Sequence, residues 1–226
     1  MKKLENYLNA NSIAYSADDT ERFELLYAVL AEKSKLFNLT AITERDDVIL
    51  KHFIDSVSGV SYIKNNCLDI GAGAGFPSLP LAILKKDVDF LAVDGTQKKV
   101  DFLTYAAEKL CLKNYTVIHS RAEDMKDKRE SFYTVVARAV APLNILCEYA
   151  LPFLQRGGRL VAYKGAKTAE EVDAAQNALT ELGGVVIEVA DAKIEGFGRK
   201  LVIIEKAKQT PQKYPRGGNK PRIKPL

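Results

Sequence analysis

The first 60 or so residues carry apolar side chains mostly at helical spacing. Asp18 and Asp19 can cap a first segment, and a second one begins at residues 44–47. We therefore expect an N-terminal helical extension over residues 1–62. The apolar positions that support it are Phe23, Leu26, Tyr27, Leu30 and Phe37 in the first segment, and Val48, Ile49, Phe53 and Val57, beside His52, in the second.

From about residue 66, short apolar runs alternate with helical segments. This alternation predicts an α/β fold over residues 63–206, with a mainly parallel sheet of about seven strands and helices on both faces. Only residues 195–198 separate the last two strands. Because that connection is too short for a parallel crossover, the last strand should run antiparallel to its neighbour. The expected strands span residues 67–70, 88–94, 115–120, 133–139, 158–165, 185–194 and 199–207.

Composition narrows the class of protein. The 226 residues are 47% apolar and 27% charged, as in a globular domain with a sizeable core. No run approaches the roughly 20 apolar residues of a membrane span, and no apolar stretch after the N-terminus resembles a secretory signal. Three widely spaced cysteines suit a reducing compartment, and two histidines make a zinc site unexpected. We expect a cytoplasmic protein without a metal, and by default a monomer.

Positive charge is concentrated at the C-terminus. The net charge is +4, but residues 206–226 hold seven Lys or Arg and no Asp or Glu, which leaves residues 1–205 at −3. Four of the eight prolines lie in the same stretch, so we expect a tail over residues 207–226 that is extended rather than helical. Such a tail, with Tyr214 among its cations, could follow a phosphate backbone or be a solvated, disordered end.

A glycine loop follows the first expected strand. It contains Asp69, Gly71, Gly73 and Gly75, and Asp94 comes 23 positions after Gly71, at the end of the second strand. Glycines permit a tight turn and let a ligand approach the backbone at the carboxyl end of a strand. A carboxylate at the second strand end can accept hydrogen bonds from both hydroxyls of a ribose. The loop therefore predicts a nucleoside-containing ligand.

The spacing of the glycines favours S-adenosylmethionine over a dinucleotide. The dinucleotide fingerprint is G-x-G-x-x-G, whereas here the third glycine comes one residue early and Phe76-Pro77 follows. The phosphate loop G-x-x-x-x-G-K-[ST] is also absent from the sequence. D-x-G-x-G-x-G is typical of class I S-adenosylmethionine-dependent methyltransferases, and a dehydrogenase is the alternative. Residues 120–124, after the third strand, form a polar loop that can border an adenine ring.

The residues after the fourth strand, together with the cysteines and histidines, argue against several classes of methyl acceptor. The residues after the strand lack the Asn or Asp followed by two prolines and an aromatic that serves exocyclic amines of bases. Methylation of pyrimidine carbon 5 needs a cysteine nucleophile, but Cys67, Cys111 and Cys147 are interpreted as packing residues. Oxygen methylation commonly uses a metal or a well-placed histidine, and neither His52 nor His119 suits that role. An acceptor that loses no proton, such as guanine N7, remains.

Four cations lie at the carboxyl ends of expected strands, where function is located in this architecture. Any one of them alone would be a surface cation. Together they favour a nucleic acid as the substrate. These cations are Lys98, Arg121, Arg138 and Lys164.

At these residues the chain resembles the RsmG (GidB) family of bacterial small-subunit ribosomal RNA methyltransferases. The most specific matches are ARAVAPL at 137–143, Lys164-Gly165 and Tyr214-Pro215-Arg216. The remaining matches are Asn38-Leu39-Thr40, residues 52–56, 69–77 and 94–99, Phe102-Leu103, residues 121–123, Ala162-Tyr163 and Arg199.

The resemblance implies methyl transfer from S-adenosylmethionine to N7 of one guanine, guanine 527, in the 530 loop of 16S rRNA, within the small ribosomal subunit. It implies that the donor contacts Gly71, Phe76, Ala122-Glu123 and Arg138, with Asp94 on the ribose. It also assigns Lys98, Arg121, Arg138 and Lys164 to substrate RNA or catalysis.

Two departures from the family pattern are present. Ser78 replaces a glycine after Phe-Pro, and Gly95-Thr96 replaces a pair that contains serine. The N-terminal helices could cap the sheet near the donor, or meet ribosomal RNA or protein. Two other functions stay open at this point: a module that binds S-adenosylmethionine and RNA without turnover, and a methyltransferase for small molecules.

Overall fold

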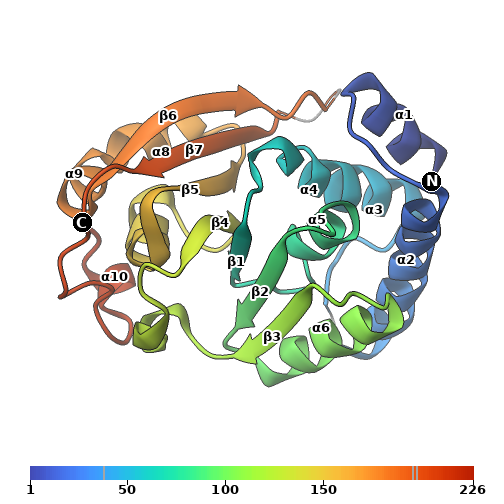
Figure 1. Ribbon diagram of the computed structural model, residues 1–226, viewed down its shortest axis with the longest axis horizontal. Helices are drawn as coiled ribbons and strands as arrows, with labels where there is room; N and C mark the ends of the chain where they lie inside the picture. The colour runs from blue at the N-terminus through green and yellow to red at the C-terminus, as the bar shows by residue number, and fades with distance from the viewer. Residues whose placement is uncertain (38, 195, 197) are drawn as a thin grey trace.

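A seven-stranded sheet runs through the molecule in the order β3-β2-β1-β4-β5-β7-β6 (Figure 1). In this computed structural model, β1 to β5 are parallel, whereas β7 is antiparallel to both of its neighbours, β5 and β6. The predicted α/β sheet with an antiparallel last strand is therefore confirmed. The strands are β1 (Asn66–Ile70), β2 (Asp89–Asp94), β3 (Tyr115–His119), β4 (Phe132–Arg138), β5 (Leu154–Lys164), β6 (Gly184–Asp191) and β7 (Lys200–Lys206).

The structure describes residues 1–37, 39–194, 196 and 198–226. The sequence interpretation also used some residues that lie outside the described part. These are Asn38, Glu195, Phe197 and the side chain of Phe37. Among described residues, no helix is both long and apolar enough to cross a membrane. The α-helices are α1 (Lys2–Ala10), α2 (Ala17–Phe37), α3 (Arg45–Val48), α4 (Asp55–Val57), α5 (Ser78–Leu84), α6 (Gln97–Lys109), α7 (Leu143–Ala150), α8 (Thr168–Ala174), α9 (Gln176–Leu182) and α10 (Lys220–Ile223).

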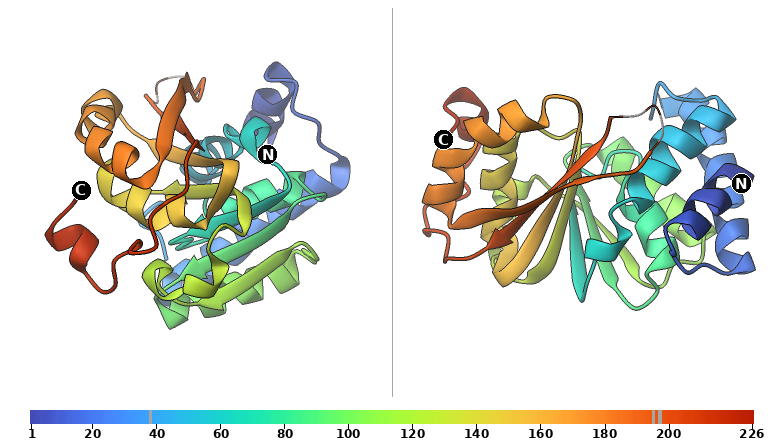
Figure 2. Two further views of the ribbon diagram at one scale, coloured as in Figure 1. Left: turned by 60° about the vertical axis from the view of Figure 1, so that its left-hand side comes forward. Right: turned by 90° about the horizontal axis from the view of Figure 1, so that it is seen from above.

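Helices cover both faces of the sheet because successive strand residues point to opposite sides. Cys67 and Val136 belong to the core on the side of α2, α5 and α6, whereas their neighbours Leu68 and Val135 belong to the core beneath α7 and α9. Both groups of helices are visible on either side of the sheet in Figure 2. Strands that are buried on both faces explain the near-continuous apolar runs in the sequence.

The N-terminal helices share the first of these cores. Phe53 is fully buried, and its ring lies 5.3 Å from that of Phe23 and 6.1 Å from that of Phe76, centroid to centroid. Between α3 and α4 the helical path widens into a π-helix, Ile49–Ile54. This rare geometry, which is frequent at functional sites, carries His52 and Phe53 on one continuous stretch. Part of the N-terminal region thus packs directly against the glycine loop.

The C-terminal tail differs from the expectation in two respects. It runs through bends and turns between residues 207 and 219, and Lys220–Ile223 forms the short helix α10. Pro221 is compatible with that helix because it lies in the first turn, where backbone N–H groups have no partner within the helix and the N–H that proline lacks is not needed. The alternative of a solvated, disordered end is wrong, since Thr210 and Tyr214 are buried and Arg216 forms an ion pair with Glu148.

The cysteines follow the sequence interpretation in two cases out of three. Cys67 and Cys147 are fully buried, as expected, whereas Cys111 is exposed. The interpretation of Cys111 as a packing residue is wrong because α6 ends at Lys109. Cys111 lies in the turn beyond it with a positive φ of 52°, and this turn directs the side chain away from the core.

Phe53→Ala tests whether the N-terminal helices and the sheet unfold together. Removing a fully buried phenyl ring from this core should lower the free energy of unfolding by about 4 kcal/mol, within a single cooperative transition. Urea denaturation followed by circular dichroism measures both properties. Leu25→Ala, at an exposed position of α2, should change the free energy by less than about 1 kcal/mol. A separate early transition in Phe53→Ala would instead indicate an independent N-terminal unit.

Candidate active site

The glycine loop after β1 requires glycine at two positions. Gly71 has a φ of 68°, and a Cβ atom there would lie 3.0 Å from Cγ2 of Val140. Gly75 has a φ of 85°, and its Cβ would lie 2.2 Å from Cδ1 of Leu79 on α5. L-residues with a side chain rarely adopt such φ values. The glycines therefore let the loop turn tightly between β1 and α5 and lie close to the segment after β4.

Asp94 is held at the end of β2 by the same loop. Its two carboxylate oxygens accept hydrogen bonds from the backbone N–H groups of Gly73 (3.0 Å) and Thr96 (2.9 Å). An ionised carboxylate has about four acceptor sites, so acceptor capacity is left for a ligand. The departure at Gly95-Thr96 preserves this arrangement, because Thr96 contributes through its backbone. The departure at Ser78 is also accommodated: its buried hydroxyl lies 2.7 Å from the hydroxyl of Tyr115.

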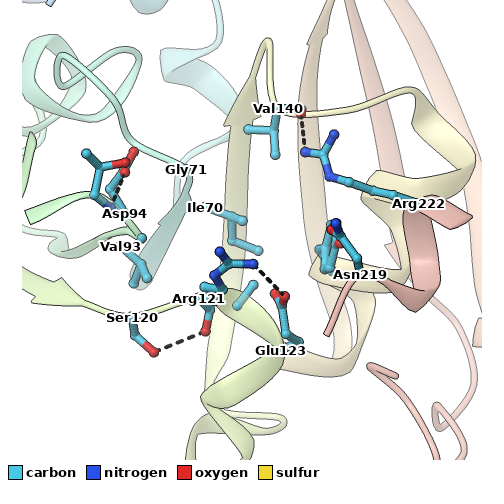
Figure 3. Close-up of a pocket in the computed structure, with 14 residues that line it drawn as sticks. Ile70, Gly71, Val93, Asp94, Ser120, Arg121, Glu123, Val140, Asn219 and Arg222 are labelled. Carbon is cyan, nitrogen blue, oxygen red and sulfur yellow. Dashed lines mark hydrogen bonds and ion pairs between the residues drawn. The ribbon is translucent and has the colours of Figure 1, made fainter. Parts of the chain in front are cut away.

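A pocket of about 230 Å³, which we call the glycine-loop pocket, opens beside Asp94 at the carboxyl ends of the parallel strands. Figure 3 shows Asp94 and Val93 on one side of it, Arg222 and Asn219 on the other, and Arg121 and Glu123 between them. Its walls combine two carboxylates, two arginines, backbone groups and apolar side chains. The lining residues are Ile70, Gly71, Val93, Asp94, Gly95, Thr96, Ser120, Arg121, Ala122, Glu123, Val140, Tyr149, Asn219 and Arg222.

A second pocket of about 310 Å³ adjoins the first and shares Val140 with it. We call it the arginine pocket because Arg138 and Arg199 line it, together with Lys164. The other lining residues are Ala139, Val140, Ala141, Pro142, Tyr163, Gly165 and Glu171. The segment after β4 thus separates the glycine-loop pocket, which contains two carboxylates and two arginines, from the arginine pocket, which contains three cations and the carboxylate of Glu171.

Arg138, at the end of β4, is bound by the N-terminal helices. Its Nη1 donates to Oδ2 of Asp55 (2.7 Å) and to the carbonyl of Lys51 (2.9 Å), and its Nη2 bonds Nδ1 of His52 (3.1 Å). Its guanidinium also lies 5.2 Å from the centre of the Phe76 ring. Arg199, before β7, is 3.5 Å from the other oxygen of Asp55. One carboxylate therefore holds two arginines at the rim of the arginine pocket.

The partners of His52 determine its tautomer. Nδ1 lies 3.1 Å from Nη2 of Arg138 and 3.2 Å from the carbonyl oxygen of Lys51, and Nε2 lies 2.9 Å from Oγ1 of Thr40. Because a guanidinium has no lone pair, we assign Nδ1 as the acceptor from Arg138 and the ring proton to Nε2, which then donates to Thr40. The ring stacks on Phe76 with 4.4 Å between centroids. Burial lowers the pKa of His52 to about 4, and the charge of Arg138 contributes. The imidazole is therefore neutral at pH 7 and adds no positive charge beside the arginine.

Lys164, at the end of β5, is held in a similar way. Its ammonium donates to Oε2 of Glu171 (2.7 Å) and to the carbonyl of Ala141 (2.8 Å). Glu171 lies on α8 and also accepts a bond from the backbone N–H of Leu143 (2.9 Å). Two of the three donors of the ammonium are thereby used, and the side chain is almost fully buried.

Asp69, the first residue of the loop motif, lies beneath the loop rather than in either pocket. It is fully buried, and neither carboxylate oxygen has a hydrogen-bond partner in the described part of the chain. Burial raises its pKa to about 7, although Ser78 and Arg138 oppose the shift. Because Asp69 is fully buried and lines neither pocket, it packs under the loop and does not face a ligand there.

The remaining predicted site residues occupy different positions. Arg121 and Lys98 are exposed; the first lines the glycine-loop pocket and lies 3.9 Å from Glu123, whereas Lys98, on α6, lines neither pocket. Gly73, Gly75 and Phe76 shape the loop behind the glycine-loop pocket without lining it. The ligand contacts inferred for all these residues stay predictions. Among described residues, no cluster of His, Cys, Asp or Glu could hold a metal.

Sequence reasoning missed several residues of these pockets. Asn219 and Arg222 were treated only as tail residues, and Tyr149 only as part of a helix. Asp55 belonged to a family match, but no role was given to it. One signal was available: His52 and Asp55 are polar residues three positions apart within an apolar helical run, and buried polar groups require partners. No comparable pattern marks Asn219.

The glycine-loop pocket fits S-adenosylmethionine. The carboxylate of Asp94 can accept the two ribose hydroxyls. Ala122 and Tyr149 give the apolar surface that an adenine ring requires, and the backbone at Gly71 lies so close to Val140 that a Cβ atom there would be 3.0 Å from its Cγ2. The fold and the residues that line the pocket therefore both fit S-adenosylmethionine as the ligand.

Comparisons with known proteins point to the same chemistry. A family model described as rRNA small subunit methyltransferase G matches residues 19–202. Ribosomal RNA small subunit methyltransferase G of Bacillus subtilis is 42% identical over 235 residues, which cover 100% of this chain and 98% of that protein. Its counterpart in Leuconostoc citreum is 41% identical over 229 residues, with 97% and 96% covered.

Solved structures agree on the fold. A proposed S-adenosyl-L-methionine-dependent methyltransferase from Methanococcus maripaludis has a TM-score of 0.57 at 16% identity and covers 81% of this chain and 93% of its own. TYW2 of M. jannaschii, in complex with AdoMet, has a TM-score of 0.54 at 19% identity, with 68% and 74% covered. The sheet is therefore that of the class I methyltransferases.

The pKa of His52 predicts how stability depends on pH. Because folding lowers the pKa from 6.5 to about 4, the native state binds fewer protons than the unfolded chain between these values. The contribution of His52 to stability is therefore present above pH 6.5 and is lost as the pH falls toward 4. From pH 7.5 to pH 5, the stability difference between the wild type and His52→Gln should shrink by about 2 kcal/mol.

Urea denaturation at the two pH values measures this difference. His119→Gln, at the exposed end of β3, is the matched control and reports what any histidine substitution does. A gap that stays constant for His52→Gln would contradict the assignment of a buried, neutral imidazole.

Proposed function

The chain belongs to the ribosomal RNA small subunit methyltransferase G family, and on this premise we propose that it transfers a methyl group from S-adenosylmethionine to N7 of a guanine in 16S rRNA. The guanine we propose is guanine 527 of the 530 loop, presented within the small ribosomal subunit. The observation that carries the proposal is the pair of adjoining pockets, one lined by Asp94 and one by Arg138, which meet at Val140.

The glycine-loop pocket is the proposed donor site. Asp94 would hold the ribose, Gly71 and the loop backbone would bound the centre of the ligand, and Ala122 and Glu123 would border the adenine. When bound, S-adenosylmethionine supplies an electrophilic methyl group on a positively charged sulfur. The chain's task is to place that group at the edge of the pocket beside Val140, which faces the arginine pocket.

The arginine pocket is the proposed acceptor site. Guanine presents N7 and O6 as neighbouring acceptors on its major-groove edge. N7 must keep its lone pair for the methyl group, so hydrogen bonds from the protein should go to O6. Lys164 has one N–H left beyond its bonds to Glu171 and Ala141, and Arg138 has two beyond its bonds to Asp55, Lys51 and His52. These N–H groups are the donors we propose for the base.

The reaction requires no base catalyst from the protein. The N7 lone pair displaces the sulfur, and the positive charge moves from the sulfonium to the methylated base. No proton leaves the acceptor, which suits a site whose one imidazole, His52, is neutral at pH 7 and bonded at both nitrogens. Catalysis then consists of positioning and of favourable electrostatics.

The electrostatics of the arginine pocket fit this movement of charge. Three cations, Arg138, Lys164 and Arg199, face two carboxylates, Asp55 and Glu171. Without the carboxylates, clustered cations would repel both the sulfonium and the methylated guanine. The exposed Arg121 and Lys98 are proposed to contact phosphates outside the pockets. An enzyme acting on ribosomal RNA suits the cytoplasm, and we propose that it acts as a monomer.

The first experiment is transfer of labelled methyl from S-adenosylmethionine to small ribosomal subunits that lack the modification. We expect label on N7 of a single guanine in the 530 loop, located by reduction and aniline cleavage, which break the chain at this modified base. Free 16S rRNA and large subunits serve as comparison substrates. Label at another base would remove the proposed position, and label on small molecules alone would remove RNA as the substrate.

Arg138→Lys separates an enzyme from a binding module. Lysine keeps the charge but cannot make the three bonds to Asp55, Lys51 and His52 at once. We expect the turnover number to fall by about 100-fold, whereas retention of RNA on a filter falls less than about threefold. Arg156→Ala, at the exposed opposite end of β5, should change neither. Equal losses of turnover and retention in Arg138→Lys would favour binding without catalysis.

A further inference from the structure

The C-terminal tail reaches the proposed donor site. Asn219 and Arg222 line the glycine-loop pocket, on the side opposite Asp94 (Figure 3). Arg222 donates to the carbonyl of Val140 at 3.1 Å. It also lies close enough to Tyr149 to lower the pKa of that phenol, although burial dominates and raises it. These contacts join residues more than 70 positions apart in the sequence at the pocket wall.

A buried ion pair fixes the tail upstream of these two residues. Arg216 donates from Nε to Oε1 of Glu148 (2.8 Å) and from Nη2 to Oε2 (2.6 Å), and its backbone N–H also bonds Oε1 (2.9 Å). Glu148, on α7, is 1% exposed. Such a bidentate pair is strong and directional. A carboxylate left alone at this depth would cost several kcal/mol, so the tail is bound to the domain at Arg216.

The same arginine also fixes α10. A third bond runs from Nη2 of Arg216 to the carbonyl of Lys224, 2.9 Å away, just beyond the helix. α10 packs against α7, and Pro221 is buried. The stretch between Arg216 and Lys224 is therefore closed at both ends by one guanidinium. Asn219 and Arg222 lie inside this loop and are held over the pocket.

Two further anchors lie before Arg216. Tyr214 is buried and its hydroxyl bonds Glu181. Arg129 bonds the carbonyls of Tyr214 and Thr210. Contacts of this number and depth exceed what a loose phosphate-binding arm requires. Such contacts are typical of a segment that is held in one fixed position on the domain.

We propose that the tail residues Asn219 and Arg222 bind the adenine end of S-adenosylmethionine, and that the Glu148–Arg216 ion pair positions them. This inference rests on the proposed function and extends its donor site. The adenine end is favoured because Asp94, which suits the ribose, lies on the opposite wall, while Tyr149 interacts with Arg222 and Glu123 lies between Arg121 and Asn219 (Figure 3). An amide can donate to and accept from an adenine edge, and a guanidinium plane stacks on an aromatic ring.

Binding of S-adenosylhomocysteine and of adenosine, measured by calorimetry on the full chain without RNA, tests the proposal. Arg222→Ala and Asn219→Ala should each weaken both ligands by about tenfold or more, and by similar factors, because both ligands contain the adenine. Lys220→Ala removes the same charge from the same helix at an exposed position that does not line the pocket. It should leave both affinities within about twofold.

A truncated chain ending at Gly217 provides a second variant. It keeps the bonds between Arg216 and Glu148 but lacks Asn219 and Arg222. Its thermal midpoint without ligand should stay within a few degrees of the wild type, while its affinity for S-adenosylhomocysteine should fall at least as far as in Arg222→Ala. For the wild type, the ligand should also slow cleavage by trypsin after Arg222.

The outcomes are separable. Unchanged affinities in Arg222→Ala and in the truncated chain would overturn the inference while leaving the donor site at Asp94 intact. Weaker binding of S-adenosylhomocysteine with unchanged binding of adenosine would place the contact at the methionine end, which also overturns it. A wild type that binds neither ligand would instead remove the proposed function itself.

Discussion

The arrangement at the carboxyl end of the sheet depends on one buried carboxylate, Asp55. Taking this charge out of water costs several kcal/mol unless its oxygens are matched by cations, and Arg138 and Arg199 lie within 2.7 Å and 3.5 Å of them. Arg138 is the last residue of β4 and Arg199 directly precedes β7, whereas Asp55 begins α4. The requirement to match this one charge therefore fastens the N-terminal helices to the sheet. It also sets the direction of Arg138, and through Arg138 the tautomer of His52. The N-terminal region thus supports the residues at the carboxyl end of the sheet, which the helical spacing of its apolar residues alone does not reveal.

The same arrangement, a carboxylate on a helix that binds a cation, occurs twice more around the two pockets. Glu171 on α8 holds Lys164, and Glu148 on α7 holds Arg216. In each case a carboxylate on a helix holds a cation from a strand end or from the tail. This has a consequence for methyl transfer from a sulfonium, in which both the donor and the product base are positively charged. Free cations would supply N–H groups but would also repel that charge. Cations already matched by carboxylates supply N–H groups with much less repulsion, and their directions are fixed before the substrate binds.

The sequence predicted well what depends on local periodicity and poorly what depends on pairing over long distances. All seven strands followed from apolar runs, and the reversed direction of β7 followed from the short connection before it, which is eight residues long (192–199) rather than the four expected. Gly71 and Asp94 were found because strand-end geometry fixes their spacing. By contrast, Asp55 and Arg138 are 83 positions apart, and Glu148 and Arg216 are 68 apart. No periodic pattern joins such pairs, since each depends on how helices dock. The exposure of Cys111 was missed for a related reason: it depends on where α6 ends, which apolar spacing locates only to within a few residues.

The tail shows why charge composition is a weak guide to a binding partner. Seven cations in residues 206–226 suggested a phosphate-binding arm, yet several of them are already engaged by the protein. Lys206 is fully buried and bonds the carbonyls of Leu151 and Leu154, Arg216 pairs with Glu148, and Lys213 pairs with Glu181. Affinity for RNA scales with the number of phosphates that are neutralised, and cations that are buried or already paired with carboxylates of the protein contribute less to that number. The charge that the tail can offer to RNA is therefore well below its formal +7. Asn219 and Arg222 of the tail line the glycine-loop pocket, and this location supports the proposed role in ligand binding, which composition could not suggest.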